Sequence, residues 1–409
     1  LHWLTRVTFW GWVFVVFLQT LFFLFFSWAV YKERNLRQPF LRMIGIASAW
    51  TTAEWLRSEV PIFGLGWNLI AYSQSDSLAI AQSTSLFGAY GLGFVIALTN
   101  ALLAETICFF VCFRKGDRSG IPCPSGRRGP VPLSSSRGLL FSWAAAGLLL
   151  ISLFGYGVYQ LMPHSLSFLR HVRLRSVPRA KVEGKQESSP LKTISWIPAF
   201  AGMTDKERSL RISLIQGNIP QTIKWEAEAR GKIIEIYMKL TELASFDQPH
   251  LVIWPEAAYP GYFNRDRDAA LIQDTVKKIG VPLVIGSPHL ETEEIAYNSA
   301  YLLSSEGEVK ARYDKQYLVP FGEYVPLKPI FGWLEPLAYL LGVSDFSAGN
   351  KPGLFKILNE EVSFSILVCF EDVFPGLARA AVRQGADFLA VITNDAWFGV
   401  SAAPYQHLQ

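Results

Sequence analysis

Cys369 ends an apolar run, and two carboxylates follow it after one intervening residue. The run Ser363–Val368 reads as a strand, and Glu371 and Asp372 follow the thiol closely. A strand that ends on a thiol places a potential nucleophile at a sheet edge, here beside groups that can control protons. A buried structural thiol is the alternative, since free cysteine is among the most buried residue types. A disulfide within the soluble region is excluded, because the other cysteines lie in or beside a hydrophobic segment (Cys108, Cys112, Cys123).

Two further segments place a reactive side chain next to residues that shape a loop. Glu256 follows Leu251–Trp254 and a proline, and Lys315 precedes a loop that contains two prolines and a glycine. A thiol is a poor nucleophile until it loses its proton, and Glu256 can act as the base. Lys315 can favour the thiolate and stabilise the oxyanion formed when a carbonyl is attacked. Taken singly, Glu256 could be a turn residue and Lys315 a solvated surface charge.

Other kinds of site find little support in the sequence. The six histidines have no spacing typical of a catalytic triad or a metal site, and no glycine-rich loop is suited to phosphate. We therefore expect neither a metal nor a cofactor. The net charge of +4 is modest, and membrane topology accounts for the basic residues in the loops between the predicted spans. We therefore expect no nucleic-acid partner.

The region that carries these residues, 210–409, alternates strand-like and helical patterns. We expect helices over about 226–245, 266–279 and 375–385, and strands over Arg211–Gln216, Leu251–Trp254, Leu283–Ser287, Ser299–Ser304, Phe364–Cys369 and Phe388–Thr393. This pattern indicates a layered α/β domain, and about 200 residues suffice for one sizeable core.

The first 162 residues have a different character. The chain is 50% hydrophobic and only 18% charged, and the apolar residues concentrate in this part. Stretches of 20 or more nearly uncharged residues can cross a bilayer. We expect a transmembrane helical domain over 1–162, with spans at about 7–30, 39–58, 78–113 and 139–162.

Lysines and arginines in the loops between these spans predict the topology. The first and third loops carry three and six basic residues and the loop at 59–77 carries none, which places the first and third loops in the cytoplasm. Everything after the last span then lies on the outer face. Residues 163–209 read as a linker with a probable insertion, and we assign no function to 116–138 or 170–209.

Several motifs together resemble a known enzyme family. Trp254-Pro255-Glu256, the loop from Lys315 to Pro326, and Cys369-Phe370-Glu371 resemble the Glu-Lys-Cys triad of the nitrilase superfamily. That loop, and the segments Asn394–Gly399, Glu54–Ser58 and Tyr72–Gln74, are similar to apolipoprotein N-acyltransferases. The resemblance implies a membrane α-helical domain plus an α/β nitrilase-like α-β-β-α sandwich domain.

The resemblance also implies a reaction and a place for it. A cysteine takes an acyl chain from a phospholipid, commonly phosphatidylethanolamine, as a thioester. The N-terminal amine of a diacylglyceryl-modified apolipoprotein then accepts it, which is the last step of lipoprotein maturation. The enzyme would be a multi-pass protein of the bacterial inner membrane, in contact with the lipid bilayer, with its catalytic domain on the periplasmic face.

Carried onto this chain, the resemblance makes Cys369 the nucleophile, Glu256 the general base and Lys315 the oxyanion-stabilising cation. Glu323 and Glu371 would be supporting carboxylates, and Trp225 would stand at the lipid entrance. Phe370 takes a position that is often tyrosine in the family, so a hydrogen bond there is lost. The apolar loop Pro320–Pro336 would dip into the membrane as a lid, or its aromatic residues would fill the core. Its apolar side chains are Phe321, Tyr324, Ile330, Phe331, Trp333 and Leu334.

Two alternatives stay open at this point. A membrane-tethered amidase or nitrilase that acts on a small amide would share the triad and need no acyl donor. An inactive homologue is the other possibility, because the family has further helices at both ends and we expect the chain to be a fragment.

Overall fold

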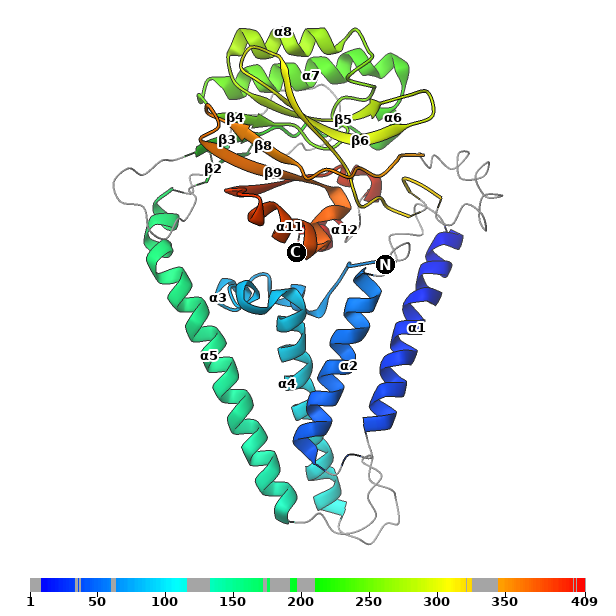
Figure 1. The fold of residues 1–409 in the computed structure, drawn as a ribbon, viewed down its shortest axis with the longest axis vertical. Coiled ribbons are helices and arrows are strands. Elements are labelled where there is room, and N and C mark those ends of the chain that lie inside the picture. The colour runs from blue at the N-terminus through cyan, green and yellow to red at the C-terminus, as the bar shows by residue number, and fades with distance from the viewer. Residues whose placement is uncertain are drawn as a thin grey trace. The chain divides into compact units, whose positions relative to one another are not determined.

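The computed structural model describes residues 9–33, 36, 38–59, 64–115, 133–171, 175–176, 192–196, 210–320, 322–325, 345–399, 401 and 403–408. The chain divides into two compact units, one formed by Leu1–Pro163 with Ala402–Gln409 and the other by His164–Ser401. The first unit is built from helices, whereas the second holds two sheets and the helices that cover them (Figure 1).

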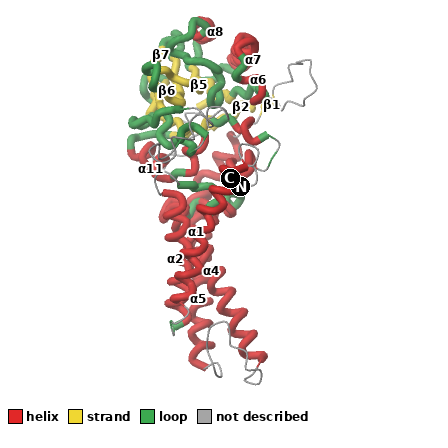
Figure 2. The backbone as a smooth tube through the Cα atoms, turned by 90° about the vertical axis from the view of Figure 1, so that its right-hand side faces the viewer, coloured by secondary structure: helices red, strands yellow, loops and turns green. Residues whose placement is uncertain are grey.

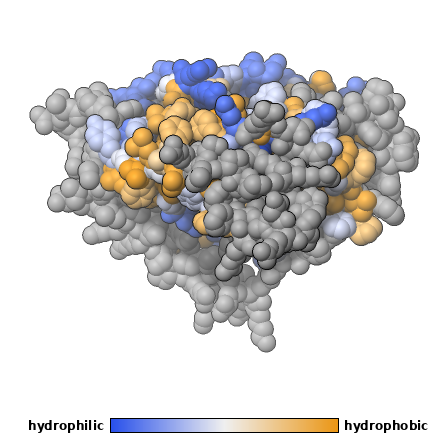
Figure 3. All heavy atoms as spheres, turned by 90° about the horizontal axis from the view of Figure 1, so that it is seen from below, coloured by the Kyte–Doolittle hydropathy of each residue, from blue (hydrophilic) through white to orange (hydrophobic). Residues whose placement is uncertain are grey.

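Long apolar helices make up most of the first unit (Figure 2). The helices that begin in it are α1 (Phe9–Glu33), α2 (Pro39–Glu59), η2 (Ile70–Gln74), α3 (Leu78–Ala81), α4 (Thr84–Lys115), α5 (Leu133–His171) and α12 (Ala403–Leu408). Three described stretches are long and apolar enough to cross a membrane, namely Val15–Glu33, Thr84–Cys108 and Leu139–Gln160. Phe17 and Leu24 of α1 are each 60% exposed, which suits side chains that face lipid. Hydrophobic residues also form patches on the face that Figure 3 shows.

The span predicted at 39–58 corresponds to α2, which is not among these three stretches. Its charged side chains are bonded within the unit. Arg42 is buried and forms an ion pair with Glu105 of α4. Glu54 accepts a hydrogen bond from the Ile70 N–H at 2.8 Å, and Arg57 donates one to a backbone carbonyl in the following loop. That α2 crosses a membrane therefore stays a prediction.

The second unit contains a seven-stranded and a three-stranded sheet. The larger sheet runs in sequence order through β1 (Arg175–Ser176), β2 (Lys192–Trp196), β3 (Leu210–Leu214), β4 (Leu251–Ile253), β5 (Leu283–Leu290), β6 (Ala296–Leu303) and β7 (Val309–Asp314). Its central strands β3, β4 and β5 are parallel, and the others pair antiparallel. The smaller sheet has the order β10 (Phe388–Ile392), β9 (Val362–Val368), β8 (Leu354–Ile357), with β9 and β10 parallel.

Two hydrophobic cores hold the layers of this unit together. One lies between the larger sheet and the helices α7 (Ala227–Ser245) and α8 (Ala269–Ile279), and the other lies between the two sheets. The helix α11 (Pro375–Arg383) packs against β9 and β10, so the layers follow the order helix, sheet, sheet, helix (Figure 1). The predicted fold class, a helical membrane domain plus an α-β-β-α sandwich, is confirmed.

The predicted elements of this unit are all present, with ends that differ by up to three residues. β7 and β8 were not predicted, because the first carries exposed charged residues and the second is only four residues long. The region read as a linker, 163–209, contains the end of α5 and two short strands, of which β2 pairs with β3. The final helix, α12, groups with the helical unit rather than with the sandwich.

Candidate active site

Cys369 occupies a tight turn at the end of a buried strand. It is the first residue of the 3-10 helix η4 (Cys369–Val373), which follows β9 without a gap. Its φ of 51° lies in the left-handed region, which a non-glycine residue adopts only at an energetic cost. Parallel pairing sets Val368 opposite Ile392, so Thr393 follows β10 at the level at which Cys369 follows β9. The Thr393 side chain is close enough to the thiol to lower the pKa of Cys369.

Glu256 lies in a second strained turn, just past β4. The next residue, Ala257, has a φ of 48°, again in the left-handed region. Gly286 of β5 lies against this turn, and a Cβ there would stand 2.7 Å from the Glu256 Cα. A glycine is therefore needed at this position for the turn to approach the sheet. The Glu256 side chain is buried.

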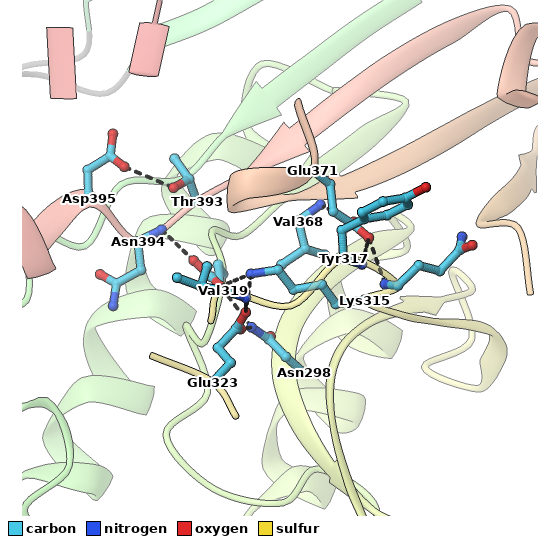
Figure 4. Close-up of polar contacts among 12 residues, drawn as sticks. Asn298, Lys315, Tyr317, Val319, Glu323, Val368, Glu371, Thr393, Asn394 and Asp395 are labelled. Carbon is cyan, nitrogen blue, oxygen red and sulfur yellow. Dashed lines mark hydrogen bonds and ion pairs between the residues drawn. The ribbon is translucent and has the colours of Figure 1, made fainter. Parts of the chain in front are cut away.

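The carboxyl group of Glu256 is fixed by two donors. Oε1 accepts a hydrogen bond from Asn298 Nδ2 at 2.8 Å, and Oε2 accepts one from the Asn394 backbone N–H at 2.9 Å. The same Asn298 Nδ2 donates to Glu323 Oε1 at 2.7 Å, so one amide group bridges two carboxylates. Glu323 Oε2 also accepts from the Val319 N–H at 2.8 Å (Figure 4).

Lys315 supplies the positive charge between these two carboxylates. It follows β7 directly and its side chain is only 1% exposed. Its Nζ lies 2.8 Å from Glu323 Oε2 and 3.8 Å from Glu256 Oε1. Burial alone would lower the pKa of Lys315, but Glu323, Cys369 and Glu256 outweigh it and raise the pKa above its ordinary value. The ammonium group is therefore charged throughout the physiological range.

Burial of Cys369 disfavours its thiolate form. It raises the pKa of the thiol well above the ordinary value, and the charge of Glu256 raises it further. Lys315 and the Thr393 side chain lower the pKa, without offsetting the first two effects. The resting thiol therefore keeps its proton, and a base must remove it before the sulfur can attack a carbonyl.

Glu371 ties the turn at Cys369 to the segment after Lys315. Its side chain is fully buried, and Oε2 accepts a hydrogen bond from the Val368 N–H at 2.8 Å. Oε1 accepts from the Tyr313 hydroxyl at 2.8 Å and from the Gln316 N–H at 2.7 Å. Burial raises the pKa of Glu371, although these donors act to lower it. The carboxyl group thus holds the turn at Cys369 and the segment after Lys315 in register.

The remaining predicted residues lie around this cluster or outside the description. Phe370 is buried and packs edge-on against Phe374 at a centroid distance of 5.1 Å. Trp225 follows the short helix α6 (Gln221–Lys224), and its side chain is 49% exposed. Of the predicted lid, Phe321 and 326–336 lie outside the described residues, and Tyr324 is partly buried.

Asn298 was missed at the sequence level, although it touches both buried carboxylates. Its only signal was a lone amide in an otherwise apolar, hydroxyl-containing strand, and a single asparagine carries no spacing from which a partner could be inferred. Thr393 was missed for the same reason. Taken together, the cluster combines a protonated thiol, a buried cation and two fixed carboxylates, which is the chemistry needed for acyl transfer through a covalent intermediate.

Known proteins share both units of this chain. Residues 211–409 match the family model of carbon-nitrogen hydrolases, and residues 1–102 match that of the apolipoprotein N-acyltransferase N-terminal domain. The chain is 33% identical to the apolipoprotein N-acyltransferase of Geobacter metallireducens, over 90% of this chain and 59% of that protein. It is 30% identical to the one of Bradyrhizobium diazoefficiens, over 90% of this chain and 59% of that protein.

A third relative, the apolipoprotein N-acyltransferase of Methylococcus capsulatus, is 27% identical over 88% of this chain and 57% of its own length. The chain thus spans somewhat under three fifths of the curated relatives named here. Among solved structures, an amidase from Nesterenkonia sp. is 22% identical over 45% of this chain and 64% of that one, with a TM-score of 0.34. In its first 102 residues and along nine tenths of its length the chain is therefore similar to apolipoprotein N-acyltransferases, and residues 211–409 match the carbon-nitrogen hydrolases.

Proposed function

We propose that this chain transfers an acyl chain from a phospholipid to the N-terminal amine of a diacylglyceryl-modified apolipoprotein, through a thioester on Cys369. The observation that carries the proposal is the cluster of Glu256, Lys315 and Cys369 in a chain that also holds helices able to cross a membrane. A lipid-anchored donor and acceptor would meet such an enzyme in two dimensions, which saves part of the entropy of encounter.

In the first half-reaction, Glu256 takes the proton of the Cys369 thiol. The sulfur attacks the ester carbonyl carbon of the phospholipid, and Lys315 stabilises the negative charge on the carbonyl oxygen. The tetrahedral intermediate then breaks its bond to the alkoxide oxygen of the lysophospholipid, which leaves with the proton held by Glu256. The acyl chain remains on the sulfur as a thioester.

In the second half-reaction, the free amine of the acceptor attacks the thioester carbonyl. Glu256 accepts a proton from the attacking nitrogen, the carbon–sulfur bond breaks, and the thiolate recovers the proton. Lys315 again stabilises the oxyanion. The product is an amide, and the enzyme returns to its resting state.

The supporting residues act through the catalytic ones. Glu323 fixes the Lys315 ammonium group, and Glu371 holds the turn at Cys369. The exposed indole of Trp225 and the loop Pro320–Pro336 would meet the acyl chains, the loop as a lid that dips into the bilayer. Phe370 contributes packing alone. We place the enzyme in the bacterial inner membrane, with the sandwich on the periplasmic face and phosphatidylethanolamine as donor.

A two-substrate assay tests this function. The purified chain is incubated in phosphatidylethanolamine vesicles with a synthetic diacylglyceryl-cysteinyl peptide, and the peptide mass is followed with and without Cys369→Ala. We expect the mass of the peptide to rise by one acyl group with the intact chain and to stay unchanged with Cys369→Ala. Ammonia release from small amides, without acylation of the peptide, would favour the amidase instead. If neither acylation of the peptide nor release of ammonia is detected, the chain is an inactive homologue.

A further inference from the structure

We propose that Lys224 is a positioning residue for Glu256. With Gln221, it holds the turn that carries this carboxyl group, and its charge adjusts how the carboxyl group takes up and returns a proton. The inference deepens the proposed function and rests on it, since it assigns a role in the same reaction to a residue outside the Glu-Lys-Cys triad.

The short helix α6 contacts the surroundings of Glu256 at both of its ends. Gln221, its first residue, accepts a hydrogen bond from Asn394 Nδ2 at 3.0 Å, and the backbone N–H of the same asparagine holds Glu256 Oε2. Lys224, its last residue, donates from Nζ to the Glu256 backbone carbonyl at 3.3 Å. Glu256 is thus held from one side by Asn298 and Lys315 and from another by α6.

The turn needs such support because its backbone is strained. The left-handed conformation of Ala257 and the close approach of Gly286 leave the turn little freedom to relax. A donor on the Glu256 carbonyl satisfies a polar group that would otherwise cost free energy in a buried position. Displacement of the turn would shift the carboxyl group relative to Lys315 and Cys369.

Lys224 is unusual among buried cations. Its side chain is 3% exposed, yet no ion pair within 4.0 Å joins it to a carboxylate in the part of the chain that the structure describes. Burial lowers the pKa of Lys224 to about 8, and the charge of Glu256 opposes this shift. Glu256 is the charged group that acts on Lys224, and Lys315, Glu323 and Cys369 surround the carboxyl group of Glu256. The ammonium group is therefore charged at neutral pH and loses its proton in mildly alkaline solution.

The charge of Lys224 has a definite effect on the reaction. While it is present, it attracts the carboxylate of the nearby Glu256, the group that accepts the thiol proton in the proposed reaction. When it is lost, the electrostatic support for the carboxylate weakens, although a neutral amine can still donate to the carbonyl. Cys369 acylation should therefore show an inflection near the pKa of Lys224, at about pH 8.

The test compares Lys224→Met and Lys224→Arg with the unaltered chain in phosphatidylethanolamine vesicles. Lys232→Met serves as the control, since Lys232 is an exposed lysine of the next helix, α7. The rate of Cys369 acylation is measured in a single turnover against pH and donor concentration. We expect Lys224→Met to slow acylation by about tenfold, with donor half-saturation changed less than about twofold, and to remove the alkaline inflection. Lys224→Arg should keep most of the rate and also lack the inflection, because arginine stays charged.

An unchanged rate and pH profile in Lys224→Met would overturn the proposal. If that variant does not fold, the arginine variant decides, since an inflection that persists in it cannot come from residue 224. Alkylation of Cys369 by iodoacetamide needs no lipid and separates this proposal from the proposed function. If the unaltered chain forms no thioester, slower alkylation in Lys224→Met than in Lys232→Met still supports the role of Lys224, and equal rates refute it.

Discussion

At the scale of single residues, the site consists of a thiol that its surroundings keep protonated, a carboxylate that can accept the thiol proton and a cation that can stabilise the thiolate. Burial and Glu256 raise the pKa of Cys369, while Lys315 and Thr393 oppose them. The position of the Lys315 ammonium group is fixed by Glu323, whose Oε2 lies 2.8 Å from Lys315 Nζ. Such an arrangement favours proton transfer during the reaction over a permanently ionised nucleophile.

The protonated thiol gives a prediction for alkylation. In a chain with Cys108, Cys112 and Cys123 replaced by serine, iodoacetamide should modify Cys369 slowly at neutral pH. Because a raised pKa lowers the thiolate fraction at any given pH, the rate should still be rising at pH 9, the ordinary pKa of a thiol. The measurement is the mass of the tryptic peptide over time, and a rate that levels off below that pH would contradict the account.

A second prediction concerns the amide that bridges two carboxylates. Asn298→Leu keeps the size of the side chain but removes both hydrogen bonds, to Glu256 and to Glu323. We expect a loss of about 3 kcal/mol in the free energy of unfolding, since bonds to charged groups are the stronger ones, and a fall in acylation of about 10². Asn298→Asp should cost more, because it brings a third carboxylate into the cluster. Native melting temperature and rate in the leucine variant would exclude a role for the bridge.

At the scale of elements, the site arises because four strands end near one another. Glu256 follows β4, Lys315 follows β7, and Cys369 and Thr393 follow the paired strands β9 and β10. Strand ends are where open α/β sheets usually place their sites. Glu371 then links the β7 end to the β9 end through the Tyr313 hydroxyl and backbone donors.

The approach of two backbones gives the prediction at this scale. Gly286→Ala would push a methyl group into the turn at Glu256, where the Cβ has no room. We expect a lower melting temperature and a fall in acylation of at least about tenfold, because the carboxyl group is displaced. Gly231→Ala is the matched control, since nothing lies within 4 Å of a Cβ there and the position is inside α7. It should leave activity unchanged and stabilise the chain slightly. Equal behaviour of the two variants would contradict the role given to Gly286.

The sequence allowed the prediction of strand ends but not of the contacts between them. The strands before Glu256 and Cys369 were recognised as short apolar runs, and the long helices as nearly uncharged stretches. β7 was not, because its alternating charged and apolar residues also suit a surface loop. The bridge at Asn298 and the contacts of α6 depend on which strands become neighbours in the fold. A single asparagine or lysine in the sequence does not indicate which residue it will contact.

At the scale of the whole molecule, an apolar helical unit is joined to a sandwich of the carbon-nitrogen hydrolase type. The division was visible in the sequence, since the nearly uncharged stretches correspond to the three long apolar helices. α2 is different, because its arginines and glutamate are bonded inside the unit and lower its hydropathy. Composition alone therefore leaves its relation to the membrane undecided.

The basic loops give a prediction for topology. Single cysteines are introduced by Lys32→Cys and Gln384→Cys, both at exposed positions, into a chain without other cysteines. In cells with a permeable outer membrane, a membrane-impermeant maleimide should label the cysteine at position 384 and leave the one at position 32 unlabelled until the inner membrane is disrupted. The reverse pattern would place the sandwich in the cytoplasm and would exclude the proposed setting.

The most direct test of the account is the mass of the peptide that contains Cys369 after the chain is incubated with phosphatidylethanolamine vesicles. We predict one acyl group on this peptide, which hydroxylamine cleaves as it does a thioester and which is lost when a diacylglyceryl-cysteinyl peptide is added. Glu256→Gln should form the adduct far more slowly. Absence of the adduct from the intact chain, or an acyl group that stays when the acceptor is present, would contradict it.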